Sequence, residues 1–151
     1  MRTKLVVLTC LLLVGMIMPS FAQIKEVPKT IPQGKWEVKQ VTIEKNTDGN
    51  VQITAYNTAA EMQKYPLPIE WEIKDSQTIV WYYGNGVEQM LEYSLEENDK
   101  LQIVTTTLQS YQYSINGNTM TLITTNNYKQ TLHTGHTEHI NEKWTIVLQQ
   151  K

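Results

Sequence analysis

The feature that most constrains this chain is a regular succession of short alternating segments separated by turn residues. From residue 69 to residue 148, apolar and polar residues alternate with the period of two that a half-buried β-strand requires. Turn sequences such as Gly84-Asn85-Gly86 and Asn116-Gly117-Asn118 interrupt the alternation about every ten residues. This spacing predicts an all-β fold, either a sandwich or a barrel, with about eight to ten strands.

The pattern also predicts where the strands lie and where one helix is possible. The expected strands cover residues 36–43, 51–55, 69–73, 78–83, 87–96, 101–105, 111–115, 120–123, 128–132 and 140–148. Apolar positions of the first strand change parity after Val38, which predicts a β-bulge near Lys39-Gln40. Residues 58–65 favour either a short helix capped by Thr58 or a loop with one helical turn, and either structure can cover one mouth of a barrel.

Residues 1–22 have the composition of a secretory signal peptide. Arg2 and Lys4 precede an apolar run, and Ser20 and Ala22 are small residues at the two positions that signal peptidase reads. We expect cleavage after Ala22, export through the Sec pathway, and a periplasmic or extracellular mature chain without a membrane-spanning segment.

The single cysteine, Cys10, tests whether the leader is a lipoprotein signal instead. Cys10 lies inside the apolar run and does not close it, so a lipid-accepting role is disfavoured. After cleavage the chain has neither a disulfide nor a thiol nucleophile. Residues 23–32 are an expected linker, and residues 33–151 form the single expected domain.

Charge excludes one class of partner and one kind of ligand clamp. Removal of Arg2 and Lys4 reduces 13 basic residues to 11, against 15 acidic ones, so the mature net charge is −4. A mildly acidic chain without basic clusters is not expected to bind nucleic acid. Arg2 is the only arginine, so the mature chain lacks the usual bidentate partner of carboxylate and phosphate ligands. We expect a monomer.

Three features of the mature chain resemble one known family. Gly34-Lys35-Trp36 opens the first strand, a meander of about eight strands follows, and residues 113–122 combine a Tyr-x-Ile segment, a polar turn and an alternating strand. Across residues 33–149 the chain is similar to a lipocalin-like (calycin-type) domain of exported bacterial proteins. This resemblance implies an antiparallel meander barrel of about eight strands, with Gly34 and Trp36 as structural residues at its closed end.

The chain departs from the lipocalin pattern at two positions. In that family a late arginine packs across the tryptophan, and here only a lysine such as Lys143 is available to do so. Thr125-Asn126-Asn127-Tyr128 lacks the acid of the family's Thr-Asp-Tyr element. The resemblance therefore implies the barrel architecture and not a specific lipocalin activity.

The aromatic residues of the strands are candidates for a ligand site. A barrel of about eight strands encloses space for packed side chains or for one small ligand. Tryptophan and tyrosine carry an N–H or O–H group that needs a partner, so they suit a pocket lining better than a dry core. We predict a ligand-binding role for Trp71, Tyr93, Tyr111 and Tyr113; the alternative is that they simply fill the barrel. The facing of Trp81 stays open.

All three histidines of the chain, His133, His136 and His139, fall in one segment and are a candidate site for a metal ion or haem. On a continuous strand His133 and His139 would lie about 20 Å apart, so a shared ion requires a turn at Gly135. The alternative is an exposed hairpin without a ligand. No established zinc motif has this spacing, which favours the exposed hairpin.

The sequence gives little support to catalysis. The mature chain lacks cysteine, and no serine lies in a Gly-x-Ser-x-Gly setting. Acids such as Glu72 and Glu92 alternate with apolar residues, which predicts a solvated outer face. We therefore expect a non-catalytic barrel that binds a small apolar or amphipathic molecule. The alternatives are metal or haem binding by the histidine segment and a packed scaffold that meets another protein; the sequence identifies no cofactor.

Overall fold

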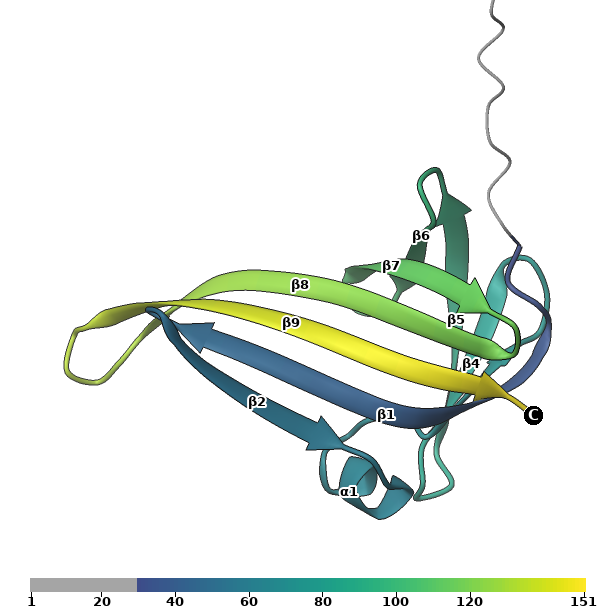
Figure 1. Cartoon of the computed structure of the whole chain (residues 1–151), viewed down its shortest axis with the longest axis horizontal. Coiled ribbons are helices and arrows are strands. Elements are labelled where there is room, and N and C mark those ends of the chain that lie inside the picture. The colour runs from purple at the N-terminus through teal and green to yellow at the C-terminus, as the bar shows by residue number, and fades with distance from the viewer. Residues whose placement is uncertain (1–29) are drawn as a thin grey trace, which may run out of the picture.

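The computed structural model describes residues 30–151, so the expected signal peptide and residues 23–29 of the expected linker lie outside the described residues. Nine β-strands and one helix form this part of the chain (Figure 1). They are β1 (Gly34–Thr47), β2 (Asn50–Tyr56), α1 (Ala59–Lys64), β3 (Glu70–Ile73), β4 (Thr78–Tyr82), β5 (Glu88–Glu96), β6 (Lys100–Val104), β7 (Leu108–Asn116), β8 (Thr119–Thr131) and β9 (Thr137–Gln150).

Eight of these strands close into an antiparallel barrel, which confirms the predicted fold class. Strands β3 to β9 form a meander in which each strand pairs with the next. Strand β1 pairs with β3 through residues 34–37 and with β9 through residues 36–47, so it joins the two ends of the meander. Strand β2 lies outside this ring and pairs with residues 41–47 of β1.

A β-bulge in β1 separates the part of the strand that pairs with β3 from the part that pairs with β2. The register with β9 shifts between Val38 and Gln40, where the sequence predicts a bulge. Before the bulge β1 has β3 beside it, and after the bulge it has β2 on the same edge. Gly34 opens the strand at a φ of +116°, a conformation that a residue with a Cβ rarely adopts.

The connection from β2 to β3 contains a helix, as one of the two predicted alternatives has it. Thr58 caps α1: its side chain accepts a hydrogen bond from the Glu61 backbone N–H at 3.2 Å. The Glu61 carboxylate in turn accepts from the Thr58 backbone N–H at 3.1 Å, which completes a capping box. Met62 is fully buried and anchors the helix to the barrel.

The inward-facing residues of all eight strands form one core. Trp36, Leu101, Leu122 and Leu148 are fully buried within it. The indole N–H of Trp36 donates to the Pro32 carbonyl at 3.1 Å, which ties the segment before β1 to the barrel wall. Lys143 does not pack across Trp36, since it lies opposite Glu44 in β1 while Trp36 lies opposite Gln150.

An ion-pair network on the outer surface ties β1, β3 and the chain end together. The Glu70 carboxylate pairs with Lys35 at 3.0 Å and with Lys151 through its second oxygen. The Lys35 ammonium also lies 4.9 Å from the centre of the Tyr82 ring, at a distance typical of a cation–π contact. The network lies where β1 meets β3, at a seam that closes the barrel.

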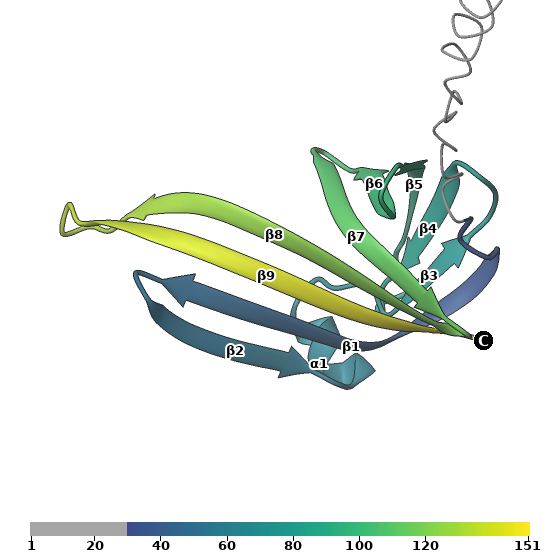
Figure 2. The ribbon, with the colours of Figure 1, turned by 45° about the horizontal axis from the view of Figure 1, so that its top comes forward.

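Four strands continue past the barrel as an extension (Figures 1 and 2). It consists of β2, the second half of β1, the first half of β9 and the second half of β8. The inner face of the barrel continues along it through Ile146, Trp144 and Glu142 of β9. In residues 30–151, no helix has the length and apolar character needed to cross a membrane.

Neighbouring residues of β8 test this assignment of inner and outer faces. We expect Leu122→Ala to lower the free energy of unfolding by about 2–5 kcal/mol, because the buried side chain leaves a cavity in the core. Ile123→Ala should change it by no more than about 1 kcal/mol, because Ile123 is 37% exposed on the outer face. Urea unfolding measures both values. Equal losses would contradict the assignment.

Glu70 makes a second prediction, about acid stability. Partial burial acts to raise the pKa of Glu70, but hydrogen bonds from Lys151 and Lys35 outweigh it and hold the pKa below its usual value. A lowered folded-state pKa stabilises the fold above the unfolded-state pKa, about 4.3, and this contribution is lost as the pH falls through the folded-state value. Glu70→Gln should therefore flatten the decline in unfolding free energy below about pH 5.

The control for this experiment is Glu88→Gln, at an exposed position of β5. Urea unfolding at a series of pH values gives, for each variant, the slope of the unfolding free energy against pH. A Glu70→Gln slope identical to that of the wild type would show that the ion pairs do not stabilise the fold.

Candidate functional site

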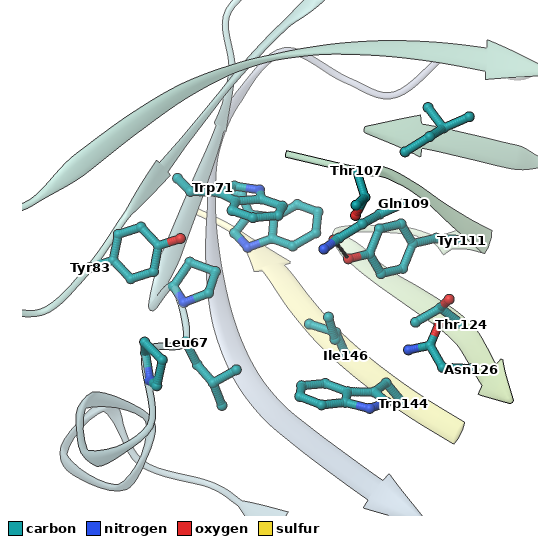
Figure 3. Close-up of a pocket in the computed structure, with 14 residues that line it drawn as sticks. Leu67, Trp71, Tyr83, Thr107, Gln109, Tyr111, Thr124, Asn126, Trp144 and Ile146 are labelled. Carbon is teal, nitrogen blue, oxygen red and sulfur yellow. Dashed lines mark hydrogen bonds between the residues drawn. The ribbon is translucent and has the colours of Figure 1, made fainter. Parts of the chain in front are cut away.

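A cavity of about 390 Å³ opens at the barrel mouth from which the extension projects (Figure 3). The connection between α1 and β3 borders it on one side, and β7, β8 and β9 border it on the other. Fourteen described residues line it. They comprise five aromatic residues (Trp71, Trp81, Tyr83, Tyr111, Trp144), five apolar residues (Pro66, Leu67, Pro68, Leu108, Ile146) and four uncharged polar residues (Thr107, Gln109, Thr124, Asn126).

Two tryptophans on adjacent strands form the inner wall of the cavity. Trp71 of β3 and Trp81 of β4 are directly opposite in register, so their side chains point to the same face. Their ring centroids are 5.2 Å apart with the planes tilted by 35°. Tyr111 of β7 approaches Trp71 edge-on at 6.2 Å, an arrangement that aromatic pairs prefer.

The indole N–H groups of these two tryptophans lack a hydrogen-bond partner. Within residues 30–151, Trp71 Nε1 and Trp81 Nε1 are the buried side-chain polar atoms that remain unpaired. An unpaired buried donor costs about 1–3 kcal/mol, so native proteins contain few of them. Both donors belong to tryptophans whose side chains line the same cavity.

Tyrosine and glutamine supply the polar part of the wall. The Tyr111 hydroxyl donates to Gln109 Oε1 at 2.6 Å. Burial, with a smaller contribution from neighbouring Tyr83, raises the pKa of Tyr111 to about 12. The Tyr83 hydroxyl donates to Gln89 Oε1 at 3.2 Å, and burial also raises the pKa of Tyr83. Both hydroxyls are therefore neutral at physiological pH and serve as hydrogen-bonding groups.

Trp144 connects the cavity to the extension. Its indole N–H donates to Glu142 Oε2 at 3.3 Å, and the Tyr128 hydroxyl donates to Glu142 Oε1 at 2.7 Å. Tyr128 lies on the inner face of β8, because it is an even number of residues from the buried Leu122. Glu142 and Trp144 lie on the inner face of β9 for the same reason, relative to the buried Ile146. A carboxylate held at both oxygens thus lies next to the mouth of the cavity.

The four predicted ligand-binding residues separate into two groups. Trp71 and Tyr111 line the cavity. Tyr93 and Tyr113 are buried inside the barrel but do not line it. The Tyr93 hydroxyl donates to the Asp75 carbonyl at 2.7 Å, in the turn between β3 and β4. The Tyr113 backbone N–H donates to the Asp99 carbonyl in the turn between β5 and β6, so both tyrosines lie toward the opposite end of the barrel.

Several lining residues are absent from the sequence-based prediction. Trp144 shares its parity with Ile146 and Leu148, and this alternation is a signal that could have placed it inside the barrel. Trp81, whose facing the sequence leaves open, points inward. Gln109 and Asn126 carry no distinguishing sequence pattern.

The histidine segment forms the outer end of the extension. His133 lies in the turn between β8 and β9, where Gly135 adopts a φ of +82°. His139 lies opposite Lys129 in β8, and His136 Nε2 is 3.9 Å from an Asp48 carboxylate oxygen. Over residues 30–151, no three His, Cys, Asp or Glu side chains lie close enough together to hold a metal ion. The predicted turn is therefore present, but it does not gather the three imidazoles.

The fold and this cavity define the class of molecule: a closed, eight-stranded antiparallel barrel with an aromatic cavity at one mouth. A comparison of the chain with family models, curated proteins and solved structures finds no match. The evidence for function therefore comes from the cavity itself.

The buried Tyr111 hydroxyl predicts a loss of stability at high pH. Because the folded-state pKa lies above the unfolded value of about 10, the unfolded chain loses its proton first, and the unfolding free energy falls as the pH rises from about 10 toward 12. Tyr111→Phe should make this fall less steep. Unfolding curves across this pH range measure the slope, and the exposed Tyr65→Phe is the matched control. Equal slopes for wild type and Tyr111→Phe would contradict the assignment.

Proposed function

We propose that this protein is an exported, lipocalin-like barrel that binds one small apolar or amphipathic molecule at its mouth and does not transform it. The observation that carries the proposal is the cavity of about 390 Å³ with five aromatic residues in its lining. This volume lies in the range of about 300–1,000 Å³ that is usual for small-molecule sites.

The composition of the cavity matches the proposed ligand. Apolar ligand surface gains about 25 cal/mol for each Å² removed from water, and the rings of Trp71, Trp81 and Trp144 offer flat faces for that contact. The four polar residues of the wall can orient one end of the ligand; they are Thr107, Gln109, Thr124 and Asn126. An amphipathic molecule satisfies both parts of the lining.

The mouth has a firmly held border, which suits a preformed site. The fully buried Met62 anchors α1, and the Gln63 side chain packs so closely on Gly84 that a Cβ there would overlap it. Leu67 and the two flanking prolines continue from this anchored helix to the edge of the cavity. Proline restricts the backbone, so little ordering is needed when a ligand enters.

The chemistry of the wall supports the proposed non-catalytic role. The fourteen described residues that line the cavity include no acid, histidine, lysine or cysteine, so the lining offers no general base and no activated nucleophile. Export is proposed from residues 1–22, whose sequence has the form of a secretory signal.

A tryptophan introduced at Thr124 tests the proposal by filling the cavity. The neutral fluorescent probe anilinonaphthalene should bind wild type and quench its tryptophan emission, because three of the four tryptophans line the cavity. Thr124→Trp should weaken probe binding by at least about tenfold, since the added ring occupies the same space. Fluorescence titration measures both effects.

Thr125→Trp is the matched control, because Thr125 is exposed and points to the outer face of β8. It should leave the affinity within about twofold of wild type. Equal weakening by the two variants, or no binding to wild type, would refute the mouth cavity as the ligand site. Circular dichroism of each variant verifies that the barrel is folded.

A further inference from the structure

We infer that the mouth cavity selects uncharged ligands, such as esters, alcohols and amides, and rejects anions such as free carboxylates and sulfonates. The inference rests on the proposed function, because it concerns the ligand of the same cavity. It narrows the ligand from any amphipathic molecule to a neutral one.

The first argument is the absence of a countercharge. The fourteen described residues around the cavity include neither lysine nor histidine, and the sequence has no arginine after Arg2. An anion that leaves water for an apolar wall needs a cation or several strong donors to compensate for its lost hydration. The cavity provides no cation, and the unpaired indole N–H groups of Trp71 and Trp81 are themselves buried.

The second argument is the carboxylate at the mouth. Trp144, which lines the cavity, donates its indole N–H to Glu142, and the Tyr128 hydroxyl donates to the other oxygen of the same group. These two hydrogen bonds hold the negative charge in place beside the entrance. Like charges repel more strongly where water is partly excluded, so an anionic ligand is opposed both inside the cavity and at its mouth.

The lysines of the barrel do not offset this charge within the cavity. Lys35 and Lys151 are committed to Glu70 on the outer surface of β3, and Lys74 pairs with Glu72 at 2.7 Å on the same surface. Lys45 lies directly opposite Glu142 in register and on the same face of the extension, but it does not line the cavity. No described lysine therefore places its charge in the lining of the cavity.

The third argument is that the polar groups of the wall suit neutral partners. The Tyr111 hydroxyl occupies the Gln109 oxygen, which leaves the Gln109 amide N–H₂ as a donor toward the cavity (Figure 3). This amide can donate to the carbonyl or hydroxyl oxygen of a neutral ligand, and the wall holds no cation that would make an anionic acceptor the preferred one. The wall therefore favours an uncharged acceptor.

Two fluorescent probes with the same ring skeleton test the inference. Anilinonaphthalene is neutral, and anilinonaphthalenesulfonate adds one permanent negative charge. We expect wild type to bind the neutral probe at least about tenfold more tightly, as measured by fluorescence titration. Equal affinities, with both lost in Thr124→Trp, would overturn the inference but retain the proposed function. Binding of neither probe would overturn both.

A lysine placed inside the cavity gives the converse test. Thr124→Lys adds the missing countercharge, so the sulfonate probe should bind at least about tenfold more tightly than it binds wild type. Thr125→Lys adds the same charge on the outer face and should change sulfonate binding by less than about twofold. Equal gains in the two variants would show that overall charge, and not the cavity, governs selection, and would overturn the inference.

Discussion

The pairing of β1 with β9 is the interaction on which the rest of the structure depends. This ladder closes the meander into a barrel and then continues beyond the barrel as the spine of the extension. The bulge between Val38 and Gln40 lets one strand do both, because it shifts the register at the point where the neighbour on the other edge changes from β3 to β2. Ile146, which lines the mouth cavity, pairs with Val41 just beyond this bulge, so the cavity lies close to the point where the neighbour of β1 changes.

The cavity combines features that a purely structural core would avoid. A core packed for stability pairs its buried donors, yet Trp71 and Trp81 keep unpaired indole N–H groups in the part of the chain that the structure describes. The opposite end of the barrel behaves differently. There the Tyr93 hydroxyl donates to the Asp75 carbonyl, so its polar atom is satisfied. The unpaired donors thus belong to two aromatic residues of the cavity, whereas Tyr111 and Trp144 in the same lining are hydrogen-bonded.

Local sequence patterns predict an all-β fold, the bulge and, as one of two alternatives, the helix, because each depends on residues close together in the chain. The strands expected at residues 120–123 and 128–132 are one continuous strand, β8. The change of parity after Val38 marks the bulge, and Thr58 with Glu61 forms the capping box of the helix. The cavity depends on which distant strands meet at one mouth, and alternation alone does not report that. Tyr93 and Tyr113 have the same alternating pattern as Tyr111, yet the turn that each contacts places them at the other end. The position of a residue along its strand, together with the register of strand pairing, decides whether it lines the cavity or belongs to the core. Residue type alone does not.

The distribution of charged residues differs between the barrel and the extension, and this difference affects which ligands can enter the cavity. Acidic and basic residues of the barrel strands alternate outward, as the ion pairs of Glu70 and Glu72 illustrate, so the inner faces are left to aromatic and apolar side chains. In the extension this separation ends: Glu142 lies on the inner face, where Trp144 and Tyr128 hold it. Lys45 lies opposite Glu142 on the same face, so the transition from an uncharged interior to charged side chains falls at the cavity entrance. A ligand that enters must pass these side chains and then leave water for a wall without a cation, and a neutral molecule does both at the lowest electrostatic cost.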